Sequence, residues 1–362
     1  MDVMKPIATK DIPKGKEWLY EVKYDGFRCV LHWEKNGDIK LISKNKKDLT
    51  PQFPEIVSFC KEKEASLKKL LPLKLDGELV ILNNQYQSNF SSIQKRGRLK
   101  NKDSIQKAAS SRPATLLAFD LLEVSGLDLS QRPFEVRKNE LHSFFQKGEL
   151  QIDVWDRIGY IEAFQDPKEL WKLIFDHKGE GMIAKSKKST YRAGKTHQDW
   201  YKIKNWRLIH GFLTEYDSKN DYFSVQVYQG ENLYSVGKCK HGLSDTDFDT
   251  VRKLFVANGD KQGTNFKLPP AISCAIHTLD IYQGELREPE FSRIAPDIKP
   301  EECTIERLEL DLAMLPKSID FANMDKYYWP DVHYTKGNFL RYMREISPYM
   351  LPFLENRALT TI

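Results

Sequence analysis

The sequence predicts an α+β protein: a domain of antiparallel sheets and helices, then a small β-barrel, then a short C-terminal extension. Up to about residue 207, strand-like segments rich in aromatic and β-branched residues alternate with segments of helix length. From 208 to 305 the strands are short and closely spaced around one helix, which is typical of a small barrel. From 306 to 362 the chain is rich in aromatic residues and prolines. We therefore expect three parts, 1–207, 208–305 and 306–362.

The first part opens with two strands between residues 17 and 35, joined at Asp25-Gly26. In the first of these strands, Glu21 and Lys23 alternate with bulky residues, so the twofold period of a strand puts both charged side chains on one face. Further strands are expected at 38–44, 73–82, 115–124, 179–186 and 199–206, and helices at 53–70, 134–146 and 167–178. The barrel is expected to contain strands at 211–217, 222–229, 232–240 and 271–285, with a helix at 246–257.

Composition excludes several classes of protein. No run of about 18 apolar residues exists, and the N-terminus has no apolar signal segment, so we expect no membrane association and a cytoplasmic location. The five cysteines are scattered without a CxxC pair, which indicates reduced, buried thiols and neither a disulfide framework nor a zinc site.

The net charge is only +5, but residues 95–107 and 185–195 are strongly basic. One such run is ordinary solvated surface, whereas two favour a polyanionic partner.

Five short motifs fall at strand ends or turns in the first part. They are KYDGFR (23–28), DGE (76–78), AFDLL (118–122), EGMIAK (180–185) and KIK (202–204). Each alone is weak, because Asp-Gly is a common turn and a phenylalanine such as Phe119 in an apolar strand is core by default. Five of them in one order are improbable as independent coincidences.

Together these residues suit nucleotide chemistry. A neutral lysine amine can attack phosphorus, and nearby cations or burial lower the pKa of a lysine. Lys202 and Lys204 share one face of their strand, so we expect them to lower the pKa of Lys23 if that face meets it. A divalent metal on a triphosphate needs one or two carboxylates. Glu78 and Glu180 are the candidates, and Phe119 is the candidate for stacking on adenine.

The motif set resembles that of ATP-dependent DNA ligases in the covalent nucleotidyltransferase superfamily, and most closely the ligase module of bacterial ligase D, over residues 4–303. The resemblance implies that Lys23 is the adenylated lysine. It implies that Glu21 lies near the adenine edge, Arg28 near ribose or phosphates and Glu78 on the ribose. It places Phe119 on adenine, Glu180 at a Mg²⁺ or Mn²⁺ ion, and Lys202 and Lys204 on the α-phosphate of ATP.

In this family a β-barrel of the oligonucleotide-binding type (OB-fold) follows and ends in a further motif, which residues 287–302 resemble. By resemblance, Arg293, Asp297 and Lys299 orient the departing pyrophosphate. The family usually has arginine where this chain has Ala295, and adjacent Asp-Lys where Ile298 intervenes, so the contacting basic residue stays open. Lys44 and Lys46 likewise stand where the resembled segment, Ser-Arg-Asn-Gly, has Arg and Gly.

The last part resembles the opening of the primase-like polymerase module of ligase D. The carboxylates that bind the polymerase's metal would lie beyond Ile362, so we expect a truncated piece without polymerase activity. The alternative is an unrelated helical extension.

The leading interpretation is an ATP-dependent DNA ligase that seals nicks or broken ends through a lysyl-AMP intermediate, in double-strand break repair by end joining. Its expected partners are duplex DNA with nicks or ends and a Ku-type end-binding protein, with the enzyme monomeric and associated with the nucleoid. Two alternatives remain: an RNA ligase or capping-type nucleotidyltransferase, and a catalytically silent DNA-binding scaffold that the Ala295 and Ile298 departures would permit.

Overall fold

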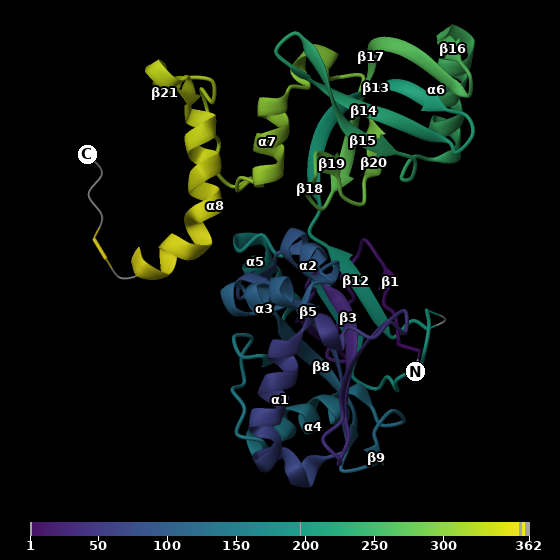
Figure 1. Cartoon of the computed structure of the whole chain (residues 1–362). Helices are drawn as coiled ribbons and strands as arrows, with labels where there is room; N and C mark the ends of the chain where they lie inside the picture. The colour runs from purple at the N-terminus through teal and green to yellow at the C-terminus, as the bar shows by residue number, and fades with distance from the viewer. Residues whose placement is uncertain (1, 196, 355–356, 359–362) are drawn as a thin grey trace. The chain divides into compact units, whose positions relative to one another are not determined.

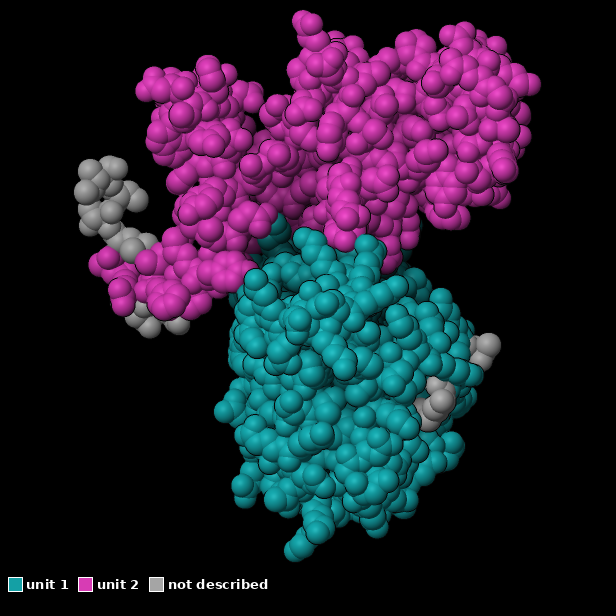
Figure 2. Space-filling model, in the orientation of Figure 1, with its two compact units in different colours: residues 1–205 teal, residues 206–362 magenta. Residues whose placement is uncertain are grey.

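The computed structural model describes residues 2–195, 197–354 and 357–358. Its contacts divide the chain into two compact units, Met1–Asn205 and Trp206–Ile362 (Figure 2). Each unit is described by itself. The three-part division predicted from the sequence remains a prediction.

The larger sheet of the first unit has six strands in the order β10-β8-β5-β3-β4, with β9 beside β8 (Figure 1). All neighbours are antiparallel except β10 and β8. The strands are β3 (Phe27–Trp33), β4 (Ile39–Ser43), β5 (Leu73–Val80), β8 (Thr115–Val124), β9 (Leu127–Asp128) and β10 (Ile158–Tyr160).

A second sheet has four strands in the order β1-β12-β11-β2. They are β1 (Ile7–Ala8), β2 (Trp18–Val22), β11 (Gly181–Ser186) and β12 (Trp200–Lys204). The two strands predicted around Asp25-Gly26 are therefore present, but β2 and β3 belong to different sheets. Gly26 carries the chain between them, and a Cβ there would lie 2.1 Å from the carbonyl oxygen of Leu79, so only glycine fits.

The predicted helices are confirmed as α1 (Pro54–Leu67), α4 (Phe134–Lys147) and α5 (Pro167–Asp176). Two further helices, α2 (Phe90–Gly97) and α3 (Lys102–Ser111), cover most of the basic run at 95–107 and were not predicted. Their N-caps are Asn89 and Asn101, whose side chains accept hydrogen bonds from the backbones of Ser92 and Ser104. Short elements complete the unit: η1 (Thr50–Gln52), η2 (Lys68–Leu70), β6 (Leu82–Asn84) and β7 (Gln87–Ser88).

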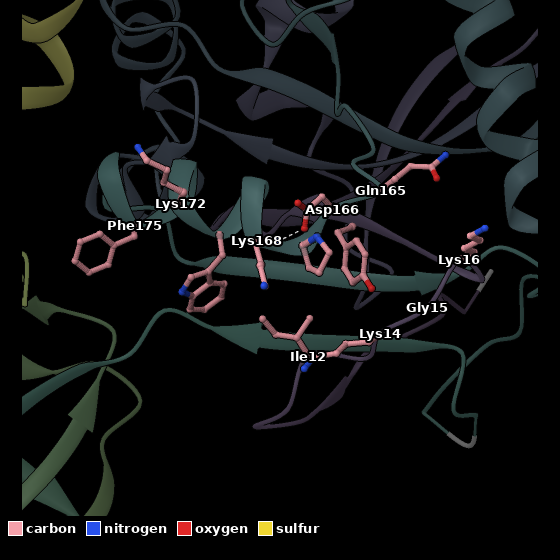
Figure 3. A pocket seen from close by; sticks show the side chains of 12 residues that line it. Ile12, Lys14, Gly15, Lys16, Gln165, Asp166, Lys168, Lys172 and Phe175 are labelled. Carbon is pink, nitrogen blue, oxygen red and sulfur yellow. Dashed lines mark hydrogen bonds between the residues drawn. The ribbon is translucent and has the colours of Figure 1, made fainter. Parts of the chain in front are cut away.

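Two apolar clusters stabilise this unit. One joins the six-stranded sheet to α1 and α4 through residues such as Leu31, Ile56 and Phe145. The other contains residues of both sheets and of α5, among them Phe119 and Ile174. On its outer side α5 borders a hollow shared with residues 12–16 (Figure 3). The second cluster thus joins the two sheets through residues along β2, β11 and β12.

The second unit contains a six-stranded sheet in the order β15-β14-β13-β17-β16, with β20 beside β17. A bridge between His241 and Glu290 brings the segment after β15 beside β20, as closure of a small barrel requires. The elements are β13 (Arg207–Asp217), β14 (Tyr222–Gln229), β15 (Asn232–Cys239), α6 (Asp245–Asn258), β16 (Asp260–Gln262), β17 (Asn265–Thr278), β18 (Ile281–Tyr282), β19 (Glu285–Leu286) and β20 (Glu290–Ile294). The long strand predicted at 271–285 begins earlier and ends at Thr278. The predicted α+β class is confirmed.

The C-terminal segment begins by packing on the barrel. Arg207 of β13 donates to the carbonyl of Leu312 in α7, and His210 lies 3.1 Å from the Asp311 carboxylate. The elements are η3 (Pro300–Glu302), α7 (Ile305–Ala313), β21 (Tyr327–Trp329), η4 (Pro330–Val332), β22 (Tyr334–Thr335) and α8 (Lys336–Leu354).

The five cysteines all lie in the described part of the chain, and all are buried free thiols, as predicted. Among the described residues, none of the helices has both the length and the apolar character needed to span a bilayer.

Candidate active site

Lys23 lies directly after β2 and faces the start of β11. Its backbone N–H donates to the carbonyl of Gly181 at 2.8 Å, which fixes its position at the sheet edge. Its amine forms an ion pair with the carboxylate of Glu180, and the two side chains are only 19% and 9% exposed. The first and fourth motifs therefore meet through a direct contact between their charged residues.

The ion pair changes the expected chemistry of Lys23. Burial alone would lower the pKa of this lysine, but the nearby carboxylates of Glu180, Asp25 and Glu78 outweigh it and raise the pKa. The prediction that Lys202 and Lys204 lower this pKa is therefore wrong for the observed arrangement. Lys23 is held as an ammonium, and the pair must open before its nitrogen can act as a nucleophile.

Lys202 and Lys204 do share a face of the four-stranded sheet with Lys23. Lys204 is paired with Gly181, and Lys202 is paired with Ile183, which in turn is paired with Glu21. Directly opposed residues point to the same side of a sheet, so the two lysines and the Lys23 end of β2 form one cationic face. Gly181 stands between Lys204 and Lys23 in this face. Only glycine fits here, because φ is +151° and a Cβ would lie 2.1 Å from a backbone carbonyl oxygen. The absence of a side chain at this position leaves room between the two amines.

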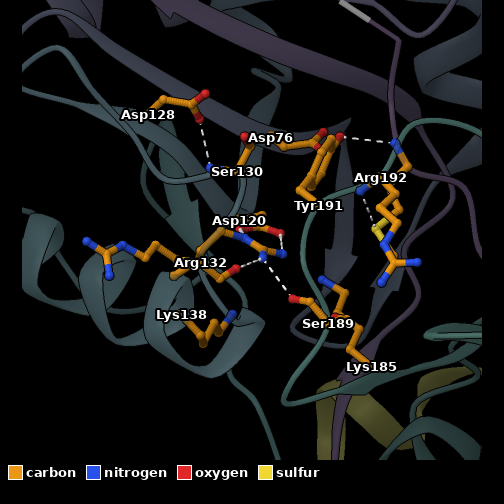
Figure 4. A network of polar contacts seen from close by, with 12 residues as sticks. Asp76, Asp120, Asp128, Ser130, Arg132, Lys138, Lys185, Ser189, Tyr191 and Arg192 are labelled. Atoms are coloured by element: carbon orange, nitrogen blue, oxygen red, sulfur yellow. Dashed lines mark hydrogen bonds and ion pairs between the residues drawn. The ribbon is translucent and has the colours of Figure 1, made fainter.

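Arg28 is held in the other sheet by Asp76. Two nitrogens of its guanidinium donate to the two carboxylate oxygens of Asp76, each at 2.6 Å. The hydroxyl of Tyr191 also donates to Asp76 at 2.5 Å and accepts from the backbone of Met4 at 3.2 Å (Figure 4). Sequence reasoning missed Asp76 and Tyr191, although Asp76 opens the second motif.

Glu78 is paired with Arg28 in register and points to the same side of the sheet. Burial raises the pKa of its carboxyl to about 8, against the lowering effects of Arg28 and Lys23. Glu180 and Asp25 raise it further. Glu78 is therefore largely protonated at neutral pH, and a cation placed beside it would ionise it.

Replacing Glu78 by glutamine is expected to stabilise the protein only at higher pH. The native pKa lies above the usual 4.5, so between pH 4.5 and 8 the folded protein binds one more proton than the unfolded chain, and its stability falls as pH rises. Glutamine has no proton to lose. The free energy of unfolding of Glu78→Gln should exceed that of the wild type by roughly 4 kcal/mol at pH 8.5 and by less than about 1 kcal/mol at pH 5. Urea unfolding at both pH values measures this, and a constant difference would contradict the raised pKa. Glu34→Gln, at an exposed position, is the control.

Phe119 is only 6% exposed, and two cations contact its ring. The guanidinium carbon of Arg28 is 4.3 Å from its ring centroid, and the amine of Lys185 is 4.1 Å from it. The stacking role stays a prediction.

Glu21 is buried and forms ion pairs with two lysines. Its carboxylate oxygens lie 2.5 Å from Lys185 and 2.6 Å from Lys138. Burial lowers the pKa of Lys185 to about 8, although Glu21 opposes the shift. The basic run at 185–195 therefore does not begin at the surface, as the sequence suggested, but with a buried amine that belongs to the site. Lys185 is part of the fourth motif, and its place in that motif was the sequence signal that could have assigned it to the site.

A second buried ion pair fixes the loop after β11. Arg137 of α4 donates twice to Asp120 of β8, each time at 2.8 Å, and also to the carbonyls of Arg132 and Ser189 (Figure 4). Both side chains of the pair are fully buried. Burial raises the pKa of Asp120, which Arg137 opposes. The pair ties α4 and the loop that carries Tyr191 to the six-stranded sheet.

The site suits a divalent cation bound together with a nucleotide. The Oε2 atom of Glu180 is buried and makes no hydrogen bond to the described residues. A hard cation satisfies such an oxygen, and Mg²⁺ commonly takes one or two carboxylates and completes its shell with phosphates and water. The described residues contain no group of three or more His, Cys, Asp or Glu side chains that could hold a metal ion. Glu180 and Glu78 would hold the divalent cation.

Arg293, Asp297 and Lys299 lie in the second unit. Arg293 and Asp297 form an ion pair at 2.5 Å with side chains 48% and 60% exposed, and Arg293 lowers the pKa of Asp297 to about 2. Ala295, where the resembled family has arginine, is fully buried, and Lys299 is exposed before η3. The structure brings together eight of the predicted residues plus Lys185 and Asp76 in the first unit. A role for the other three in orienting pyrophosphate stays a prediction.

Comparison with known proteins agrees with this fold and site. Residues 4–204 match the family described as "ATP dependent DNA ligase domain". This match covers more than half of the chain, and the chain therefore belongs to the ATP-dependent DNA ligase domain family.

Individual relatives include end-joining proteins. The "Bifunctional non-homologous end joining protein LigD" of Bacillus subtilis is 35% identical over 99% of this chain and 59% of its own length. The "Multifunctional non-homologous end joining protein LigD" of Mycolicibacterium smegmatis is 23% identical, over 81% of this chain and 38% of its own length. This chain thus spans only about three fifths or less of these relatives.

A solved structure supports the fold. A structure from an analysis of Lig E DNA ligases superposes with a TM-score of 0.53 at 16% identity, covering 81% of this chain and 99% of the other. That likeness extends beyond the first unit and agrees with the α+β class.

Proposed function

We propose that this chain is an ATP-dependent DNA ligase that works through a covalent AMP adduct on Lys23. The observation that carries the proposal is the position of Lys23, which lies at a strand end against Glu180 and on the same sheet face as Lys202 and Lys204. Membership of the DNA ligase domain family supports it.

In the first step, the neutral Nζ of Lys23 attacks the α-phosphorus of ATP. A P–N bond forms, the P–O bond to the β-phosphate breaks, and pyrophosphate leaves. Before this the proton of the ammonium must move away, and Glu180 is the nearest acceptor. Lys202 and Lys204 stabilise the negative charge that builds on the α-phosphate. A bound Mg²⁺ would neutralise phosphate charge as a Lewis acid.

In the two later steps, AMP passes from Lys23 to a DNA 5′-phosphate, and the neighbouring 3′-hydroxyl then attacks that phosphorus and releases AMP. These steps need positioning more than new functional groups. The ion pair of Arg28 with Asp76 fixes one side of the pocket for all three. The same side chains can therefore serve the whole sequence.

The proposed biological role is end joining in double-strand break repair, in the cytoplasm on nucleoid DNA. The support is the 35% identity to a Bacillus subtilis protein whose name describes non-homologous end joining. A Ku-type protein at the DNA end and a monomeric enzyme are part of the same proposal.

Labelling with α-³²P-ATP and magnesium tests the proposal. Bound AMP is first removed with pyrophosphate, and the protein is denatured after the reaction. Acid-labile label on the chain, followed by sealing of nicked duplex DNA, is the expected result. Label from GTP but not ATP would indicate capping chemistry, and sealing of nicked RNA alone would indicate an RNA ligase. A folded protein that takes no label from either nucleotide would be a scaffold.

Affinity for nicked DNA is expected to depend steeply on salt. Five cations of α2, α3 and the segment between them are exposed: Lys95, Arg98, Lys100, Lys102 and Lys107. Each phosphate contact contributes about 0.9 to the slope of log affinity against log salt. Replacing Lys95 and Lys100 by alanine should therefore reduce that slope by about 2. Fluorescence anisotropy between 50 and 200 mM KCl measures it, with Lys61→Ala/Lys68→Ala on the α1 side as matched control. An unchanged slope would remove these residues from the DNA contact.

A further inference from the structure

The hollow beside α5 is separate from the nucleotide site. It measures about 900 Å³ and is lined by residues between 12 and 16, by residues of α5 and the two residues before it, and by Tyr20 of β2 (Figure 3). Tyr20 alternates with Glu21 and therefore points to the opposite face of the sheet from Lys23. The volume of the hollow is in the range of ligand-binding pockets. None of the residues assigned above to the nucleotide lines it.

The walls of this hollow are aromatic and aliphatic, and its rim is cationic. Ile12, Trp171 and Phe175 line it, and Lys14, Lys16 and Lys168 stand around it. In Figure 3 Lys168 extends between the two wall segments, whereas Lys172 points away and pairs with Asp176 at 2.5 Å. The one carboxylate that lines the hollow, Asp166, accepts a hydrogen bond from the backbone of Lys168 and caps α5. The rim therefore has an excess of positive charge.

We propose that this hollow binds an unpaired DNA strand, with a base against Trp171 and phosphates near Lys14, Lys16 and Lys168. Aromatic rings in a positively charged groove are the usual platform for single strands, because every base has a face that can stack. The proposed function supplies the source of the strand, namely the unpaired tail of a broken end. Only this choice of source rests on the proposed function.

An extended peptide fits this surface less well. β2 is the edge strand of its sheet, but beside the hollow its backbone is already paired, since Tyr20 and Phe164 exchange two hydrogen bonds of 2.9 and 2.8 Å. A peptide therefore finds no free strand edge at Tyr20 to extend. Lysines on flexible stems suit phosphates, which need charge more than fixed geometry.

Binding of a fluorescein-labelled 12-mer of oligothymidylate to the full chain, without ATP, tests the proposal. The triple variant Lys14→Glu/Lys16→Glu/Lys168→Glu should weaken binding at least about tenfold. The control triple Lys61→Glu/Lys68→Glu/Lys69→Glu, in the middle of α1 and in η2, changes the net charge equally and should cost less than about twofold. Trp171→Ala should weaken binding about tenfold, and Trp171→Phe should restore most of it.

Four outcomes would overturn the inference. Two concern the variants: equal losses of affinity in the two triple variants, or unchanged binding in the Lys14/Lys16/Lys168 triple. Two concern competitors: a blunt 12-base-pair duplex that competes as well as the unlabelled strand, or a Phe-containing acidic peptide that displaces the labelled strand at a lower concentration than the unlabelled strand does. The rim lysines are exposed, so the charge variants decide the matter even if Trp171→Ala does not fold.

The two proposals fail separately. Sealing of a tail-free nick should stay at the wild-type level in the Lys14/Lys16/Lys168 triple, whereas joining of ends with unpaired tails should fall. A wild-type protein that binds the oligonucleotide but takes no label from ATP contradicts only the ligase proposal.

Discussion

Replacing Lys23 by alanine is expected to abolish labelling by α-³²P-ATP and to reduce nick sealing at least about 10⁴-fold, because the variant lacks the only atom proposed to bond to AMP. The fold should persist, since Lys23 follows β2 and its backbone hydrogen bond to Gly181 does not need the side chain. Gel detection of labelled protein measures the first step, and a nicked duplex measures the whole reaction.

Lys23→Arg is the matched variant for this experiment. Arginine keeps a positive charge beside Glu180 but stays protonated at any accessible pH, so it cannot serve as the nucleophile. We expect this variant to fold like the wild type and to take no label. Sealing of DNA that already carries a 5′-AMP bypasses the first step and should survive better in both variants. Label retained in Lys23→Ala would move the adduct to another residue and refute the proposed mechanism.

Replacing Arg137 by methionine is expected to be the most destabilising of the changes considered, at about 3–5 kcal/mol. The substitution leaves the fully buried Asp120 without its cation, and it also frees the carbonyls of Arg132 and Ser189. Urea unfolding followed by tryptophan fluorescence measures the loss.

Two variants show whether the unpaired charge is the cause. Lys172→Ala breaks an exposed ion pair with Asp176 and should cost less than about 1 kcal/mol. Arg137→Met/Asp120→Leu removes both buried charges and should recover most of the lost stability. A double variant as unstable as Arg137→Met would show that packing, not charge, is what Arg137 contributes.

Much of the site follows from local sequence. Lys23 follows a strand whose alternation could be read from the sequence, Glu180 precedes a segment predicted as a strand, and β11 places them side by side. Lys202 and Lys204 could be put on one face from alternation alone. The outlines of α1, α4 and α5 followed from helix-length apolar patterns.

The features that the sequence did not predict depended on contacts between distant parts of the chain. Lys185 sits in a basic run that looks solvated, and only the fold shows that Glu21 and three aromatic rings surround it. Whether the pKa of Lys23 is raised or lowered depended on which charged group lies nearest to its amine. That group is the carboxylate of Glu180 and not a second lysine. The helices α2 and α3 were missed because their apolar positions are few among basic residues, while Asn89 and Asn101 gave the only cap signals.

The ion pair between Lys23 and Glu180 also bears on chemical durability. Aldehydes and acyl phosphates modify lysines through the uncharged amine, as ATP does in the proposed first step. As long as Glu180 holds Lys23 as an ammonium, that residue reacts more slowly with such metabolites than an unpaired lysine would. The contact that slows the wanted reaction therefore also protects the protein from irreversible modification between catalytic cycles.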